Sequence, residues 1–133
     1  MKVLLDTHVW FWAVEIPRQL GPKMRALLKD ERNYRAVSAV SALEIARLVW
    51  SGDIILQIPL QEWMEKSLAD LRADTLPVTH EIAVEAYQLP KPFHRDLADR
   101  QIVACARLQE LTVATADERI LSWNHVSSVD ARK

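Results

Sequence analysis

The chain has 133 residues, half of them apolar and about a quarter charged, as is typical of one globular domain, here residues 1–133. Its 17 basic and 18 acidic residues give a net charge of −1, which argues against nucleic-acid binding mainly through a broad basic surface. Asp6 and His8 interrupt the apolar N-terminus, so we expect neither a signal peptide nor a membrane segment. The single cysteine, Cys105, cannot form an internal disulfide, which fits a reducing cytoplasm.

Short apolar runs alternate with amphipathic or capped segments along the whole chain. The elements predicted in chain order are a strand at 3–5, helices at 7–15 and 21–30, a strand at 35–40, a helix at 41–51, a minor strand at 54–58, a helix at 60–73, a strand at 75–79, helices at 80–89 and 96–110, a strand at 111–115, a helical turn at 117–121 and a strand at 126–129. Gly52 is expected just past the end of its helix. This alternation predicts an α/β domain with a parallel sheet.

Two aspartates lie just after predicted strands. Asp6 follows Val3-Leu4-Leu5, and Asp117 follows the run at 112–115. In open parallel sheets, ligands bind in the crevice beyond the carboxyl ends of the strands. The structural alternative is that each aspartate caps the helix that follows it, and for Asp6 alone the two interpretations are equally good.

Two further acids lie on predicted helices. Glu44 is four residues past Val40 and three before Arg47, and taken alone it is better explained as a solvated pair with Arg47 than as a site residue. Asp99 falls on the apolar face of its helix, where an unpaired carboxylate is costly, so we expect it to be paired or metal-bound. Asp96 lies one turn earlier and is the natural N-cap, with Asp99 as the third helical residue.

Together, these acids predict a carboxylate cluster at one edge of the sheet. Such a cluster repels itself unless cations neutralise it. Carboxylates with water suit Mg²⁺ or Mn²⁺, whereas cysteine and histidine do not gather in the sequence as zinc would require. A bound Mg²⁺ can activate water for phosphodiester hydrolysis.

Four segments, "LLDTHVWFW", "VSAVSALEIARL", "HRDLADRQIVACA" and "TVATADERI", occur in an order and spacing that resemble the PIN-domain family. The likeness is to the VapC-type toxins of bacterial toxin–antitoxin pairs and covers nearly the whole chain. One departure is Leu97, where this subgroup usually has proline; it removes no oxygen ligand.

The resemblance implies a three-layer α/β/α fold and a Mg²⁺- or Mn²⁺-dependent endoribonuclease that cleaves tRNA or rRNA. It also implies a cognate antitoxin, with the toxin as a homodimer or in a hetero-oligomer with it. By this likeness the catalytic and metal-binding residues are Asp6, Glu44, Asp99 and Asp117.

Neighbouring residues are expected to assist these acids. Asp96 is an extra acid of the subgroup, and Thr7 or Thr115 would orient a water molecule. Three basic residues close to the acids are expected to hold backbone phosphates, although a solvated basic cluster is an equal alternative; they are Lys91, Arg95 and Arg100.

Trp10, Phe11 and Trp12 fall on several faces of one short helix. Core packing explains at least one of them. Any exposed remainder would suit an antitoxin or a second copy. His8 and His94 are candidates for substrate contact, although a lone histidine is more often structural.

Other protein classes share an α/β fold and an acidic pocket. A phospho-accepting receiver module starts from an adjacent acidic pair, but Asp6 is followed by Thr7. A dehalogenase-type phosphatase needs a second aspartate at the position that His8 occupies. A catalytically silent binding module remains open, although the presence of all four acids argues against it.

Overall fold

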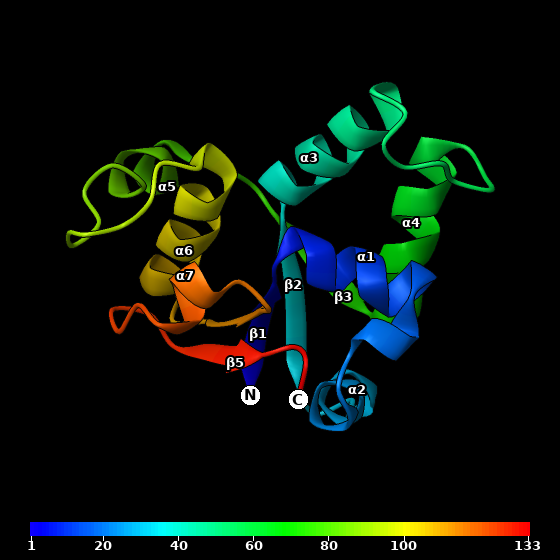
Figure 1. Ribbon diagram of the computed structural model, residues 1–133, viewed down its shortest axis with the longest axis horizontal. Coiled ribbons are helices and arrows are strands. Elements are labelled where there is room, and N and C mark those ends of the chain that lie inside the picture. Colours follow the sequence, from blue (N-terminus) through cyan, green and yellow to red (C-terminus); the bar gives the residue numbers. More distant parts are fainter.

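A five-stranded parallel sheet forms the centre of the molecule (Figure 1). The computed structural model describes residues 1–133. The strand order is β3-β2-β1-β4-β5, and every neighbouring pair is parallel. The strands are β1 (Lys2–Leu5), β2 (Tyr34–Ser38), β3 (Ala73–Leu76), β4 (Thr112–Thr115) and β5 (Ser128–Asp130).

Helices cover both faces of this sheet, which confirms the predicted three-layer α/β/α fold. They are α1 (Thr7–Glu15), the 3₁₀ helix η1 (Pro17–Gln19), α2 (Pro22–Lys29), α3 (Ala39–Trp50), α4 (Leu60–Leu71), α5 (His80–Glu85), α6 (Leu97–Gln109) and α7 (Glu118–Leu121).

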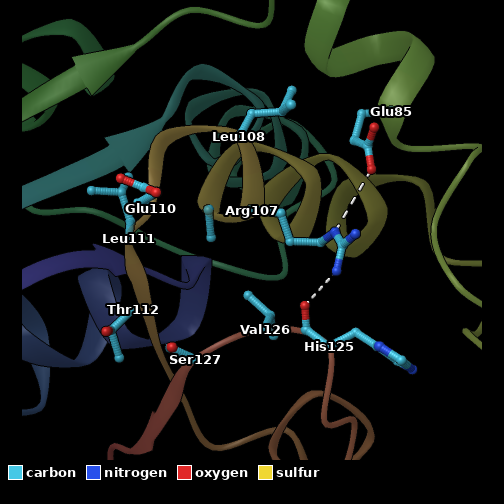
Figure 2. Close-up of a pocket in the computed structure, with 10 residues that line it drawn as sticks. Glu85, Arg107, Leu108, Glu110, Leu111, Thr112, His125, Val126 and Ser127 are labelled. Atoms are coloured by element: carbon cyan, nitrogen blue, oxygen red, sulfur yellow. Dashed lines mark hydrogen bonds and ion pairs between the residues drawn. The ribbon is translucent and has the colours of Figure 1, made fainter.

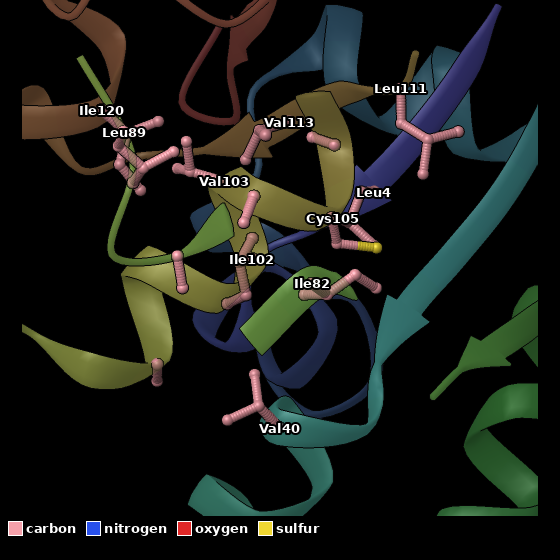
Figure 3. Packing of buried hydrophobic residues seen from close by; sticks show 14 of the residues in the cluster. Leu4, Val40, Ile82, Leu89, Ile102, Val103, Cys105, Leu111, Val113 and Ile120 are labelled. Carbon is pink, nitrogen blue, oxygen red and sulfur yellow. The ribbon is translucent and has the colours of Figure 1, made fainter. Parts of the chain in front are cut away.

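The two cores follow the alternation of side chains along the strands. Leu4 of β1 faces a cluster of 16 buried residues shared with α5, α6 and α7 (Figure 3). Val3 and Leu5 face the opposite cluster, of 11 buried residues, shared with α1, α2, α3 and α4. Cys105 lies in the first cluster, where burial raises the pKa of its thiol to about 11.

The chain changes direction across the sheet at β1. β2 and β3 follow on one side of β1, whereas β4 and β5 lie on the other. The carboxyl ends of β1 and β4 therefore flank a topological switch point, which is where open α/β sheets form ligand crevices. The residues that follow these two strands are the ones positioned for a site.

Helix α3 ends as Gly52 predicts. Gly52 has φ +82° and its N–H donates to the Val49 carbonyl, while the N–H of Asp53 donates to the Leu48 carbonyl. This is a Schellman ending, in which two free carbonyls of the last turn gain donors.

The minor strand predicted at 54–58 is wrong. Ile54, Leu56 and Ile58 are half-buried and alternate with exposed residues, as in a strand, but they pair with no neighbouring strand. Leu56 and Ile58 pack instead against the second core. Alternating burial therefore arose here from a loop that covers the core.

Two predicted boundaries also differ from the structure. The strand expected at 75–79 lies at Ala73–Leu76, because Pro77 has no N–H to donate to a ladder. The helix expected at 80–89 ends at Glu85, and residues 86–88 continue as turns. None of the helices combines the length and the apolar character needed to cross a membrane.

Candidate active site

Asp6 lies directly after β1 and is almost fully buried, at 3% exposure. One carboxylate oxygen accepts the N–H of Thr7 at 2.8 Å, which makes Asp6 the N-cap of α1. The other accepts the hydroxyl of Thr115 at 2.7 Å. The cap and the site interpretations of Asp6 are thus compatible, because each oxygen retains a further lone pair.

Thr115 connects the ends of the two central strands. Its hydroxyl oxygen, besides donating to Asp6, accepts the N–H of Asp117 at 3.0 Å. Asp117 in turn caps α7 by accepting the N–H of Arg119. The sequence expectation that Asp6 and Asp117 meet at one edge of the sheet therefore agrees with the geometry.

Glu44 reaches the same edge from α3. Its Oε1 lies 2.5 Å from the hydroxyl of Thr7, which also lies 2.8 Å from Oγ of Ser41. Burial raises the pKa of Glu44, and the nearby charges of Asp96 and Asp6 raise it further, while the Thr7 hydrogen bond opposes them. Arg47 forms no ion pair with Glu44, so the alternative in which these two residues form a solvated pair is wrong.

Asp99 lies in the first turn of α6 with its side chain 13% exposed. Asp96 is the N-cap of this helix, since its carboxylate accepts the N–H of Asp99 at 2.9 Å. Burial is the main reason that the pKa of Asp99 is raised to about 6, and the charges of Asp6 and Asp96 act in the same direction. Asp99 is therefore held among like charges.

Three cationic or protonatable side chains meet these carboxylates and were not assigned to them from the sequence. Nδ1 of His8 lies 3.7 Å from Oδ2 of Asp6. Nε2 of His94 lies 2.6 Å from Oδ2 of Asp99. Arg119 forms ion pairs with Asp117 at 2.9 Å and with Asp99 at 3.5 Å. The Arg119 hydrogen bond is the main reason that the pKa of Asp117 is lowered.

A cavity of about 250 Å³ opens onto three of the carboxylates. Asp6, Glu44 and Asp99 line it together with apolar residues that include Phe11 and Ile54. Ligand atoms of His94, Asp99 and Asp117 also lie within 4.8 Å of one another. The predicted acids thus converge on one small region.

The donor atoms of this region fit a hard divalent ion. Most are carboxylate oxygens, the ligands that Mg²⁺ and Mn²⁺ prefer, and two histidines, His8 and His94, are also present. Burial is the main cause of the raised pKa values of Glu44 and Asp99, and the charges of Asp6 and Asp96 add to it; a bound divalent ion would favour the charged carboxylates.

The three basic residues expected at phosphates differ in their surroundings. Lys91 and Arg95 are exposed. Arg100 donates to the carbonyls of Ala86 at 3.0 Å and Phe93 at 2.9 Å, so its guanidinium fastens main chain before α6. We therefore leave Arg100 out of the phosphate-binding set.

The aromatic residues of α1 are packed into the protein. Trp10 is fully buried and donates its indole N–H to Ser67 at 3.0 Å, while Phe11 and Trp12 are half-buried against the same core. The expectation of an exposed aromatic surface on α1 is therefore not met. The exposed tryptophan is Trp50 at the end of α3, at 87% exposure.

Nε2 of His8 accepts the N–H of Ala116 at 2.9 Å, which is a structural contact. His8 also lines the cavity of the carboxylates, so its contact with a substrate stays a prediction.

The largest cavity, of about 600 Å³, lies at the opposite end of the sheet (Figure 2). It lies where α6 ends and β4 begins, and it is lined by Glu85, Arg107 and His125 among others. Arg107 donates to the His125 carbonyl and lies 3.7 Å from the Glu85 carboxylate. The Glu85 carboxylate in this cavity is therefore already paired with a cation.

A family model described as PIN domain matches residues 3–125. The chain belongs to the PIN-domain family. This PIN-domain protein is 33% identical over 123 residues to Ribonuclease VapC22 of Mycobacterium tuberculosis, covering 92% of both chains. The resemblance found in the sequence is thereby confirmed.

Solved structures share the PIN fold at lower identity. One is VapBC2 from Rickettsia felis bound to a promoter DNA fragment, with a TM-score of 0.70 and 16% identity over 97% of this chain and 98% of that one. Another is a toxin–antitoxin complex from Klebsiella pneumoniae, with a TM-score of 0.67 and 18% identity over 97% of both chains. These likenesses concern the fold alone.

Proposed function

We propose that this PIN-domain protein is a Mg²⁺- or Mn²⁺-dependent endoribonuclease that acts as the toxin of a toxin–antitoxin pair. The observation that carries the proposal is the convergence of Asp6, Glu44, Asp99 and Asp117 at the switch point of the sheet. Burying like charges costs folding free energy, so their convergence points to a bound cation.

The relatives agree with this activity. The relative at 33% identity is named a ribonuclease, and the similar solved structures include toxin–antitoxin complexes. Family membership also removes the receiver and phosphatase alternatives. A catalytically silent module is the remaining alternative, which an activity measurement decides.

The carboxylates would have different roles in binding the ion, according to their positions. Asp6 and Asp99, which line the cavity from two sides of the switch point, would hold the ion directly, with Glu44 and Asp117 completing its surroundings. When bound, the ion would supply an activated water and stabilise the leaving oxygen of the RNA phosphodiester.

Two hydroxyl groups hold the carboxylates in position. Thr115 fixes Asp6, and Thr7 fixes Glu44. Asp96 caps the helix that carries Asp99 and adds negative charge nearby. Lys91 and Arg95, both exposed before α6, would attract the RNA backbone to this edge.

The proposed cellular setting follows from the family. The substrate would be tRNA or rRNA in the cytoplasm. A cognate antitoxin would bind the chain and inhibit it, and the chain would form a homodimer or a hetero-oligomer with that antitoxin. Exposed apolar side chains, Trp50 at 87% and Ile55 at 84%, offer area for such an interface.

Incubating the purified chain with end-labelled total tRNA and rRNA tests the proposal. We expect discrete cleavage in Mg²⁺ or Mn²⁺ and none in excess EDTA, with activity restored when the ion is added back. Cleavage that persists undiminished in EDTA, or no cleavage with any divalent ion, would contradict it. Sequencing RNA ends after brief expression without antitoxin would identify the target.

A further inference from the structure

A second cavity, of about 550 Å³, borders the acid cluster on its outer side. It is lined by residues 92–94, which precede α6, and by Arg119 and residues 122–125 of α7 and the following loop. Two of its lining residues also contact the carboxylates, because His94 meets Asp99 and Arg119 meets both Asp99 and Asp117. The cavity and the acid cluster are therefore continuous.

The lining of this cavity contains no carboxylate. Its polar groups are Arg119, two histidines, Asn124 and Ser122. The cavity at the opposite end of the sheet, by contrast, contains Glu85 and Glu110. In a chain with net negative charge, a cavity lined by a cation and neutral polar groups beside a metal-type site suits an anionic ligand.

The position of Arg119 follows from a local pattern. Four Asp-x-Arg segments occur in the chain, and in three of them the arginine fork binds the preceding aspartate with an Nη2–Oδ2 distance of 2.8–2.9 Å. These three are Asp30–Arg32, Asp117–Arg119 and Asp130–Arg132, whereas Arg72 pairs with Glu31 instead of Asp70. Only Arg119 also reaches a carboxylate of the acid cluster, Asp99. Its guanidinium is thus held at the junction of cluster and cavity.

The contacts of Arg119 leave it available to a substrate. Its side chain is 59% exposed, and exposed ion pairs of this kind contribute little to stability. A divalent ion on Asp99 and Asp117 would neutralise the charge that holds the guanidinium there. Its planar set of N–H donors matches a phosphate.

The cavity is also large enough for a nucleotide, and it has aromatic walls. Trp123 is buried and packs edge-on against the half-buried Phe93 and the exposed ring of His125, with centroids 4.9 and 5.1 Å apart, so the His125 ring is the one open to a base. Exposed aromatic rings stack on unpaired bases without a strong sequence preference.

We propose that this cavity binds one nucleotide of a single-stranded segment of the RNA, with Arg119 on the phosphate next to the carboxylates. The proposal rests on the ribonuclease function above and specifies where its substrate lies. Arg119 takes part as a phosphate-binding residue, in addition to the basic residues before α6.

Fluorescence anisotropy with a fluorescein-labelled single-stranded RNA tests this directly. The measurement uses the Asp6→Asn chain in Mn²⁺ buffer, so that the RNA is not consumed, over a series of salt concentrations. Arg119→Gln should weaken binding about tenfold, as expected for one charge-assisted contact. It should also reduce the slope of log K against log salt by about 0.7. Arg119→Lys, which keeps the charge but loses the fork, should lie between.

Matched variants separate the cavity from general charge effects. Arg132→Gln removes the equivalent arginine of another Asp-x-Arg segment and should change affinity less than about twofold. Asn124→Asp puts one negative charge into the cavity and should weaken binding about threefold, whereas Gln61→Glu, in the exposed first turn of α4 on the other face of the sheet, should not.

Unchanged affinity in Arg119→Gln would overturn the proposal. A loss of affinity in Arg119→Gln would also overturn it if the salt slope were unchanged and Asn124→Asp bound RNA with unaltered affinity. The carboxylates of Asp99 and Asp117, which Arg119 would no longer neutralise, would then explain the loss. Calorimetric Mn²⁺ titration of Arg119→Gln should give affinity at least equal to that of the unaltered chain. Failure of the unaltered chain to cleave RNA would refute the ribonuclease function alone, since the binding measurement needs no cleavage.

Discussion

The two ends of the parallel sheet differ in how many carboxylates gather there and in how these are paired with arginine. At the amino end, the larger cavity contains Arg107 between Glu85 and a main-chain carbonyl (Figure 2). At the carboxyl end, Asp6, Glu44, Asp99 and Asp117 converge around a single arginine, Arg119, and the pKa values of Glu44 and Asp99 are raised. The clustering of buried carboxylates, rather than cavity size, distinguishes the candidate active site.

This difference has an energetic consequence. Ionising Asp99 in the folded state costs free energy because the side chain is buried beside other carboxylates. A sequence under no functional constraint would relieve that cost with a neutral residue. On the proposed function, the carboxyl end would give up stability in order to bind a cation, whereas the amino end would not.

The largest expected effect is on activity at the carboxyl end. Asp99→Asn should lower RNA cleavage at least about a thousandfold, equivalent to about 4 kcal/mol, because a metal-binding oxygen is lost. Asp6→Asn should behave alike while keeping its helix cap, since asparagine is also a good N-cap. Cleavage rates and far-UV circular dichroism measure this, with exposed Asp70→Asn as the control. Full activity in either site variant would contradict the mechanism.

A smaller loss of RNA cleavage is expected when the changed residue only positions a carboxylate. Thr7→Val removes the hydroxyl that donates to Glu44, and should slow cleavage about thirtyfold, or about 2 kcal/mol. Because that bond lowers the pKa of Glu44, the acidic limb of the pH–rate profile should move to higher pH. Thr7→Ser should retain most of the activity. An unshifted profile in Thr7→Val would remove Thr7 from this role.

Stability should change in the opposite direction to activity at Asp99. The pKa of Asp99 is raised from 3.8 to about 6, so the folded protein binds this proton more tightly than the unfolded chain. Its contribution to stability is greatest below pH 4 and is lost as the pH rises through 6. Asp99→Asn should therefore increase the free energy of unfolding at pH 7.5, without metal, by about 1 kcal/mol.

Urea denaturation at pH 4 and 7.5 measures this stability change. Asp70→Asn, on an exposed pair with Lys66, should shift stability by only a few tenths of a kcal/mol. Destabilisation by Asp99→Asn at pH 7.5 would mean that the carboxylate stabilises the metal-free fold, contrary to the comparison.

The smallest effect on activity is expected at the amino end. Arg107→Gln should leave RNA cleavage within about twofold and lower stability by about 1 kcal/mol or less, because it removes one partly exposed ion pair and one hydrogen bond. Steady-state cleavage and thermal melting measure these effects. A large loss of activity with an unchanged melting temperature would place function in the larger cavity.

The parts of the fold that depend on local pattern could be predicted from the sequence. β1 followed by Asp6, β4 followed by Asp117, and the Asp96 cap before Asp99 each depend on neighbouring residues and on the geometry of parallel strands. The Schellman ending at Gly52 is of the same kind. Strand-like alternation at 54–58 was misleading because a loop against a core produces it too.

The positions of the cationic side chains at the site could not be predicted from the sequence, because they depend on how distant segments pack. The Asp117-x-Arg119 pattern is visible in the sequence, but its distance from Asp99 depends on how α7 packs beside α6. His94 meets Asp99 because the segment before α6 turns back on that helix. Arg100 looked free for phosphate, and only the fold reveals the carbonyls that it binds.

Anomalous diffraction from crystals soaked in Mn²⁺ would test most directly the claim that the carboxylates form one divalent-ion site. We expect an anomalous peak within about 2.2 Å of carboxylate oxygens of Asp6 and Asp99, and its loss in Asp99→Asn. A peak between Glu85 and Glu110 at the amino end, or none at saturating Mn²⁺, would contradict the account.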